Sequence, residues 1–202
     1  MGREPLTPPL CLGHYQSGTA GATAAMGAVF AREASGEGQH IDISEAQVWA
    51  TLHTGNQESS FIMHGMKRMR WGHRTPGVYP YTILPCKDGF MSMIAIQGYQ
   101  WKRFLEMMGD GQVPEWYTSD PRFQDRREIS LKYADEMDGR LAPWLTTHTK
   151  AEIYKLCLEK KVPFAPVRNM AEVVNDAHLK AREYFAEVNH PAAGTLRYPG
   201  AP

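Results

Sequence analysis

The first candidate for chemistry is a histidine near the start of the chain. His14 belongs to the sequence Gly-His-Tyr-Gln, shortly before a run of glycine and alanine that begins at Gly18. An imidazole can transfer protons near neutral pH, can contact a substrate beside a neighbour such as Gln16, or can simply hydrogen-bond within a turn. No Asp or Glu occurs between Glu4 and Glu33, so this stretch holds no carboxylate nucleophile. All three roles of the histidine stay open.

A basic loop from residue 67 to residue 80 is the second candidate for chemistry. It contains Gly72, His73, Arg74 and Gly77. Arginine binds phosphate and carboxylate groups, and a loop with glycines can close over a ligand. A solvated basic loop has the same composition, so a role as a mobile cover and a plain surface role both remain open.

The helix that follows His14 is almost without side-chain bulk. Each glycine in a helix costs roughly 0.5–1 kcal/mol relative to alanine, so we expect another backbone, from a body that these 202 residues do not supply, to pack closely against this helix. Ser35-Gly36 predicts its end, and Ile41 and Ile43 predict a short extended segment. Ser44-Glu45-Ala46-Gln47 fits a capping box and predicts the start of a second helix.

The remaining elements are predicted from turn residues and hydrophobic periodicity. Asp88-Gly89 predicts a hairpin between residues 79 and 96, and Trp101, Phe104, Leu105 and Met108 predict an amphipathic helix that ends at Gly109. Further along the chain the pattern predicts a helical region after Asp120-Pro121, a capped helix at Thr149, an extended segment over 162–167, short helices after Asn169 and over 178–183, a strand over 185–188 and a turn at Gly194.

Several of these features, in this order, resemble class III CoA-transferases, a family that includes formyl-CoA transferase, carnitine CoA-transferase and alpha-methylacyl-CoA racemase. The resemblance rests on the small-residue helix with Arg32, on Ser35-Gly36-Glu37-Gly38-Gln39 and Ile41-Asp42-Ile43-Ser44, and on segments 79–80, 85–89, 120–123, 162–167, 176–182 and 190–194.

The resemblance implies an α/β fold class, with this chain as a segment of the class III CoA-transferase fold. Residues 1–44 correspond to the end of a large Rossmann-like α/β domain, residues 45–78 to an interdomain linker that interlocks with a partner subunit, residues 79–167 to a small α+β domain, and residues 168–202 to a return towards the large domain. The half of the family fold that should precede Pro5 is absent, so we expect a fragment or one subunit of a larger assembly.

The resemblance also implies a mechanism in which an aspartate attacks an acyl-CoA and carries CoA as an enzyme thioester. Counting back from Arg32 without gaps places that aspartate at His14, or at Gly13 if the register slips by one, and since neither is acidic the family aspartate is replaced. The implied contacts to substrate or CoA are Gln16, Gly72, His73, Arg74 and Gly77. CoA and acyl-CoA are then substrates, and no tightly bound cofactor is expected.

Three functions follow from this resemblance. The first is CoA transfer between an acyl-CoA and a carboxylic acid, in a homo- or hetero-oligomer with an interlocked subunit. The second is a catalytically silent structural subunit, which the histidine at position 14 favours. The third is an acyl-CoA racemase or isomerase, which uses proton transfer without a covalent step.

Composition excludes other classes. The 202 residues are 43% hydrophobic, and 22 basic residues balance 22 acidic ones, which argues against nucleic-acid or polybasic membrane binding. No apolar run reaches the ~18 residues of a membrane span. The spacing of the three cysteines and eight histidines fits neither a disulfide framework nor a metal site. We expect a cytoplasmic protein with reduced thiols.

Overall fold

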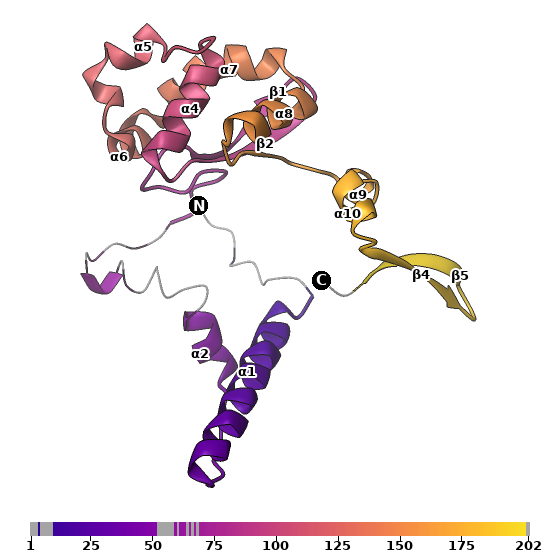
Figure 1. Cartoon of the computed structure of the whole chain (residues 1–202). Helices are drawn as coiled ribbons and strands as arrows, with labels where there is room; N and C mark the ends of the chain where they lie inside the picture. The colour runs from indigo at the N-terminus through magenta and orange to yellow at the C-terminus, as the bar shows by residue number, and fades with distance from the viewer. Residues whose placement is uncertain are drawn as a thin grey trace. The chain divides into compact units, whose positions relative to one another are not determined.

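The computed structural model describes residues 4, 10–51, 59, 61–63, 65, 67 and 69–200. It divides into two compact units, Met1–Arg70 and Trp71–Pro202, and each unit is described by itself (Figure 1). The predicted domain boundaries, at residues 44, 78 and 167, are finer than this division and remain a prediction.

The first unit is built on two helices. Helix α1 spans Leu12–Ser35, and the short helix α2, Glu45–Trp49, packs against it. Gly36 ends α1 with a φ of 75°, and its N–H donates to the Arg32 carbonyl at 2.8 Å, which confirms the predicted stop. Ser44 precedes α2 as expected, but its side chain makes no capping hydrogen bond, so the predicted capping box is wrong. No strand is assigned over residues 37–44.

The close packing expected along α1 is not found within the described part of the chain. No residue of α1 is buried. A Cβ added at Gly18 or Gly27 would meet no atom within 4 Å, and one added at Gly21 would meet Ile43 Cγ1 at 4.0 Å. The reason is that α2 covers only the first turns of α1, near Gly13. That a body outside these 202 residues covers α1 stays a prediction.

The second unit contains the core, which forms on one face of a small antiparallel sheet. Strands β1, Tyr81–Cys86, and β2, Gly89–Ile94, form the predicted hairpin around a two-residue turn, and β3, Ala165–Pro166, pairs with β2. Within β1 burial alternates, so Leu84 points inward while Tyr81 and Ile83 lie on the exposed face. Within the predicted 162–167 strand, β3 is limited to Ala165 and Pro166, and the Val167 N–H also donates to the Phe90 carbonyl at 2.9 Å.

Helices cover the buried face of this sheet. In chain order they are α4 Gly98–Met108, α5 Glu115–Thr118, the 3-10 helix η2 Pro121–Phe123, α6 Arg126–Glu128, the π-helix η3 Ile129–Tyr133, α7 Ala134–Thr147 and α8 Lys150–Lys160. The α4 residues Trp101, Phe104 and Leu105 are buried, and Gly109 ends α4, both as predicted. Thr149 and Glu152 form the predicted capping box of α8.

The chain then leaves the core (Figure 1). Two short helices, α9 Met170–Val174 and α10 Ala177–Ala181, are followed by the hairpin of β4 Phe185–His190 and β5 Gly194–Pro199. These elements confirm the helices predicted after Asn169 and near residue 178, and the turn at Gly194. Among the residues that the structure describes, no helix is long and apolar enough to cross a membrane.

Candidate functional site

His14 lies in the first turn of α1 and not in a turn before it, because the helix already begins at Leu12. Its Nδ1 lies 2.9 Å from Oε2 of Glu45, the first residue of α2. Both side chains are accessible, with exposed fractions of 73% for His14 and 45% for Glu45. The structure therefore supplies the carboxylate partner that the neighbouring sequence of His14 lacks.

The close approach of α2 to α1 requires glycine at position 13. A Cβ on Gly13 would overlap Glu45 Oε1 and would lie 2.6 Å from the indole nitrogen of Trp49. Gly13 thus admits α2 to the start of α1 and brings Glu45 beside His14. Gln16 lies in the same first turns of α1 and is half-buried.

Three of the predicted loop residues come together in the second unit. Gly72, His73 and Arg74 line a cavity of about 220 Å³, whose other walls are residues of β1, residues of β2 and Thr75. The φ of Gly72 is 66° and that of Gly77 is 119°, so both need glycine. Gly77 does not line this cavity, and its N–H donates to Ser130 Oγ at 3.1 Å.

The Arg74 guanidinium is paired within the protein. It contacts Asp135 at 2.7 Å and also Asp138, and Tyr79 Oη donates to Asp138 at 2.6 Å. Burial alone would lower the Arg74 pKa, but the hydrogen bonds and charges of the two aspartates outweigh it and raise that pKa. Burial, together with the Asp138 charge, raises the Tyr79 pKa well above its usual value. These contacts attach the loop to α7, and whether Arg74 also contacts a ligand remains a prediction.

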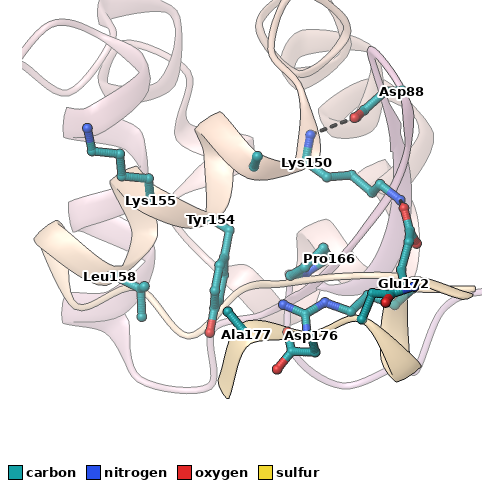
Figure 2. Close-up of a pocket in the computed structure, with 12 residues that line it drawn as sticks. Asp88, Lys150, Tyr154, Lys155, Leu158, Pro166, Glu172, Asp176 and Ala177 are labelled. Carbon is teal, nitrogen blue, oxygen red and sulfur yellow. Dashed lines mark hydrogen bonds and ion pairs between the residues drawn. The ribbon is translucent and has the colours of Figure 1, made fainter. Parts of the chain in front are cut away.

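A larger cavity, of about 550 Å³, lies where α8 meets the segment that leads to α9 and α10 (Figure 2). Lys150 of its lining pairs with Glu172, and Arg168 pairs with Asp176 and lies 5.9 Å from the centre of the Tyr154 ring. The Lys150 hydrogen bond lowers the Glu172 pKa, and the Leu179 backbone N–H contributes most to lowering that of Asp176. The lining also holds Lys155 and Asp88, so its three cations are balanced by three carboxylates and the cavity has no net charge to favour an anionic ligand.

The Lys150 backbone N–H also donates to Asp88 Oδ1 at 2.7 Å, which ties the β1–β2 turn to the start of α8 (Figure 2). We interpret this region as a junction of the small α+β unit. In the described residues, no group of three His, Cys, Asp or Glu side chains is arranged to hold a metal ion.

His14 with Glu45 is therefore an arrangement that can take part in proton transfer or in nucleophilic attack. It places an accessible carboxylate against an imidazole. Reasoning from the sequence missed Glu45, because it searched for a carboxylate next to His14, whereas Glu45 lies 31 residues later. The signal that could have found it is the Gly36 turn, which sends the chain back so that the start of a second helix can meet the first.

Comparison with known proteins identifies the family to which the chain is similar. The family model described as CoA-transferase family III matches residues 1–202. The succinyl-CoA:mesaconate CoA-transferase of Haloarcula marismortui is 29% identical over 168 residues, which cover 83% of this chain and 40% of that protein. The succinate–glutarate CoA-transferase of Agrobacterium fabrum is 26% identical over 73% of this chain and 36% of its own length.

A solved structure agrees with the fold. The CAIB/BAIF family protein from Brucella suis superposes with a TM-score of 0.65 at 20% identity, over 99% of this chain and 54% of that one. At this identity the likeness concerns the fold alone. The chain spans about 40% or less of the length of the two curated relatives described above.

Proposed function

Because the chain belongs to CoA-transferase family III, we propose that it forms part of an enzyme that transfers CoA between an acyl-CoA and a carboxylic acid. The family match along residues 1–202 is the observation that carries this proposal. The two curated relatives support it, since both are named for CoA transfer between acids. CoA and acyl-CoA are then substrates, and the proposal includes no tightly bound cofactor.

The proposed chemistry is covalent transfer through an enzyme carboxylate. The carboxylate attacks the thioester, and the released CoA thiolate converts the mixed anhydride to an enzyme-bound thioester. An acceptor acid then collects the CoA by the reverse steps. A carboxylate suits this cycle because it is ionised at neutral pH and its acyl adducts stay reactive towards thiolate.

In this proposal the loop residues Gly72, His73, Arg74 and Gly77 act as a cover over the substrate, and Gln16 contacts it. The shared cavity of Gly72, His73 and Arg74 supports a grouped role for these three. Because Asp135 and Asp138 already pair with the two terminal nitrogens of Arg74, this arginine serves in the proposal chiefly to orient the loop.

We further propose that the working enzyme is a homo- or hetero-oligomer, in which residues 45–78 link a large and a small domain and interlock with a partner subunit. The exposed helix α1 supports a partner surface, since no residue of this helix is buried within the chain. The absence of disulfides among Cys11, Cys86 and Cys157 supports a cytoplasmic location.

A CoA-exchange assay tests the transfer. The protein is purified from its native host with any subunits that accompany it, and is incubated with succinyl-CoA or formyl-CoA and a panel of carboxylic acids. We expect new acyl-CoA thioesters that form only when donor and acceptor are both present. Hydrolysis to free CoA alone, or no exchange with any acceptor, would contradict the proposal.

A second function, a catalytically silent subunit, is favoured by one observation. His14 stands where the resemblance places the aspartate, and an acyl-imidazole hydrolyses too readily to pass CoA on. In this case native mass spectrometry should reveal a longer partner that carries the aspartate. A chain that is found alone and still transfers CoA would exclude this role.

A racemase or isomerase is the third candidate, since His14 can move protons. It predicts deuterium incorporation at the α-carbon of the acyl group in heavy water, without exchange of CoA between acids.

A further inference from the structure

We propose that Glu45 is the nucleophilic carboxylate of this chain, held in place by His14. This inference rests on the CoA-transfer function proposed above and names the residue that performs it. It assigns to α2 a catalytic group that the resemblance places at the start of α1.

The position of Glu45 carries the argument. The resemblance places the acyl-accepting carboxylate at position 14, and the structure brings Glu45 Oε2 within 2.9 Å of the side chain there. Glu45 is thus hydrogen-bonded directly to the residue that occupies the expected position of the nucleophile.

The environment of Glu45 suits attack on a thioester. Its side chain is 45% exposed, so a substrate can reach it. An imidazole with its proton on Nδ1 donates to Oε2 and fixes the carboxylate beside position 14. Oε1 packs against Gly13, where a Cβ would overlap this oxygen, so the backbone of α1 also holds the carboxylate in place.

The proposed steps conserve atoms and electrons. A carboxylate oxygen of Glu45 attacks the acyl carbon, the carbon–sulfur bond breaks, and CoA leaves as a thiolate. The thiolate then attacks the Glu45 carbonyl carbon of the mixed anhydride, and the donor carboxylate leaves, so that a glutamyl-CoA thioester remains. An acceptor carboxylate attacks this thioester, and the thiolate it releases attacks the acyl carbon of the second anhydride. Glu45 is regenerated, with no net change in protons or oxidation state.

Trapping the covalent intermediate tests this assignment directly in the unmodified protein. The protein, with the subunits that accompany it, is incubated with succinyl-CoA or formyl-CoA and then with hydroxylamine, which converts an acyl adduct of a carboxylate into a hydroxamate. Peptide mass mapping should place the hydroxamate on Glu45.

The other outcomes overturn the inference in distinguishable ways. A hydroxamate on another residue, in this chain or in a partner, excludes Glu45 but leaves CoA transfer standing. CoA exchange without any hydroxamate does the same. The absence of both an adduct and CoA exchange contradicts the assignment and the proposed function together.

Matched variants give a second readout. Glu45→Gln keeps an oxygen that can accept from His14, and we expect it to lower the rate of CoA exchange by on the order of 10³-fold or more. Glu33→Gln changes an exposed carboxylate of α1, and exchange should stay within about twofold. Equal exchange rates in the two variants would overturn the role of Glu45.

His14 is a positioning residue in this account, and its variants distinguish that role from a purely structural one. His14→Ala removes the hydrogen bond to Glu45 and should lower kcat with little change in KM. His14→Asn keeps a donor and should recover part of the loss. Full activity in His14→Ala, or no recovery in His14→Asn, would contradict positioning through this bond.

Discussion

At the scale of single residues, the cysteines have distinct environments. Cys11 is exposed, whereas Cys86 and Cys157 are buried. Burial raises the pKa of Cys157 to about 12 and also raises that of Cys86. Since the thiolate is the reactive form, the two buried thiols should be inert.

We therefore expect iodoacetamide to alkylate Cys11 alone in the native protein near pH 8. All three cysteines should react once urea unfolds the chain. Peptide mass mapping checks this, and rapid native labelling of Cys157 would mean that the core around α8 is open.

Two glycines of α1 should respond in opposite ways to the same change. Gly13→Ala introduces a Cβ that collides with Glu45 and Trp49, so it should separate α2 from α1. Gly18→Ala meets no atom within 4 Å and should favour the helix by roughly 0.5–1 kcal/mol. Circular dichroism of the chain reports the helicity of both variants.

The control for the two glycine variants is the NMR spectrum of the His14 ring, which reports on the contact with Glu45. In Gly13→Ala the NMR signals of the His14 ring should shift, and in Gly18→Ala they should not. Unchanged His14 signals in Gly13→Ala would mean that α2 does not lie against the start of α1.

At the scale of elements, the capping box at the N-terminus of α8 makes a pH-dependent contribution to stability. The Thr149 backbone N–H donates to Glu152 Oε2 at 2.8 Å, and this bond, with that of the Thr149 hydroxyl, lowers the Glu152 pKa. A carboxylate whose pKa is lowered on folding stabilises the folded state above its unfolded pKa, and this stabilisation is lost as pH falls through the folded value.

Glu152→Gln should therefore destabilise the chain near neutral pH, and the difference from the parent should shrink below the ordinary glutamate pKa of 4.5. Urea unfolding at a series of pH values measures this difference in the free energy of unfolding. Glu159→Gln, an exposed position on the same helix, is the control. A difference for Glu152→Gln that does not change with pH would contradict the role of the ionised cap.

Elements set by short-range signals were predictable. Asp88-Gly89 placed the hairpin turn and Thr149 placed α8, because a turn type and a cap depend on neighbours within a few residues. Ser44 correctly predicted the start of α2, but the capping hydrogen bond predicted for its side chain is not formed. The Gly36 turn indicated that the chain returns towards α1, but the contact between His14 and Glu45 did not follow from it, since that contact also depends on how closely α2 approaches Gly13.

The same limit applies to the candidate site: groupings of neighbouring residues were predictable, and long-range contacts were not. The grouping of Gly72, His73 and Arg74 follows from their adjacency. The pairing of Arg74 with Asp135 and Asp138 does not, because α7 lies about sixty residues further along the chain and meets the loop only after the sheet and helices have packed.

At the scale of the whole molecule, the two units differ in what holds them together. Every buried hydrophobic residue of the core lies between Tyr79 and Phe164, within the second unit, and none of the described residues of α1 or α2 is buried. Because apolar burial is the dominant stabilising contribution, we expect the cooperative unfolding transition of the chain to be the unfolding of the second unit.

A shortened chain of residues 71–202 should consequently unfold at the same urea concentration as the full chain, within experimental error. Tryptophan fluorescence follows the transition through the buried Trp101. A much lower midpoint for the shorter chain would show that the first unit stabilises the core.

The most direct test of the account is the transfer of CoA itself. The protein and its accompanying subunits are incubated with succinyl-CoA or formyl-CoA and isotopically labelled carboxylic acids, and the CoA thioesters are followed by mass spectrometry. The account predicts labelled acyl-CoA that forms at the expense of the donor thioester. No labelled thioester with any acid, or hydrolysis in its place, would contradict it.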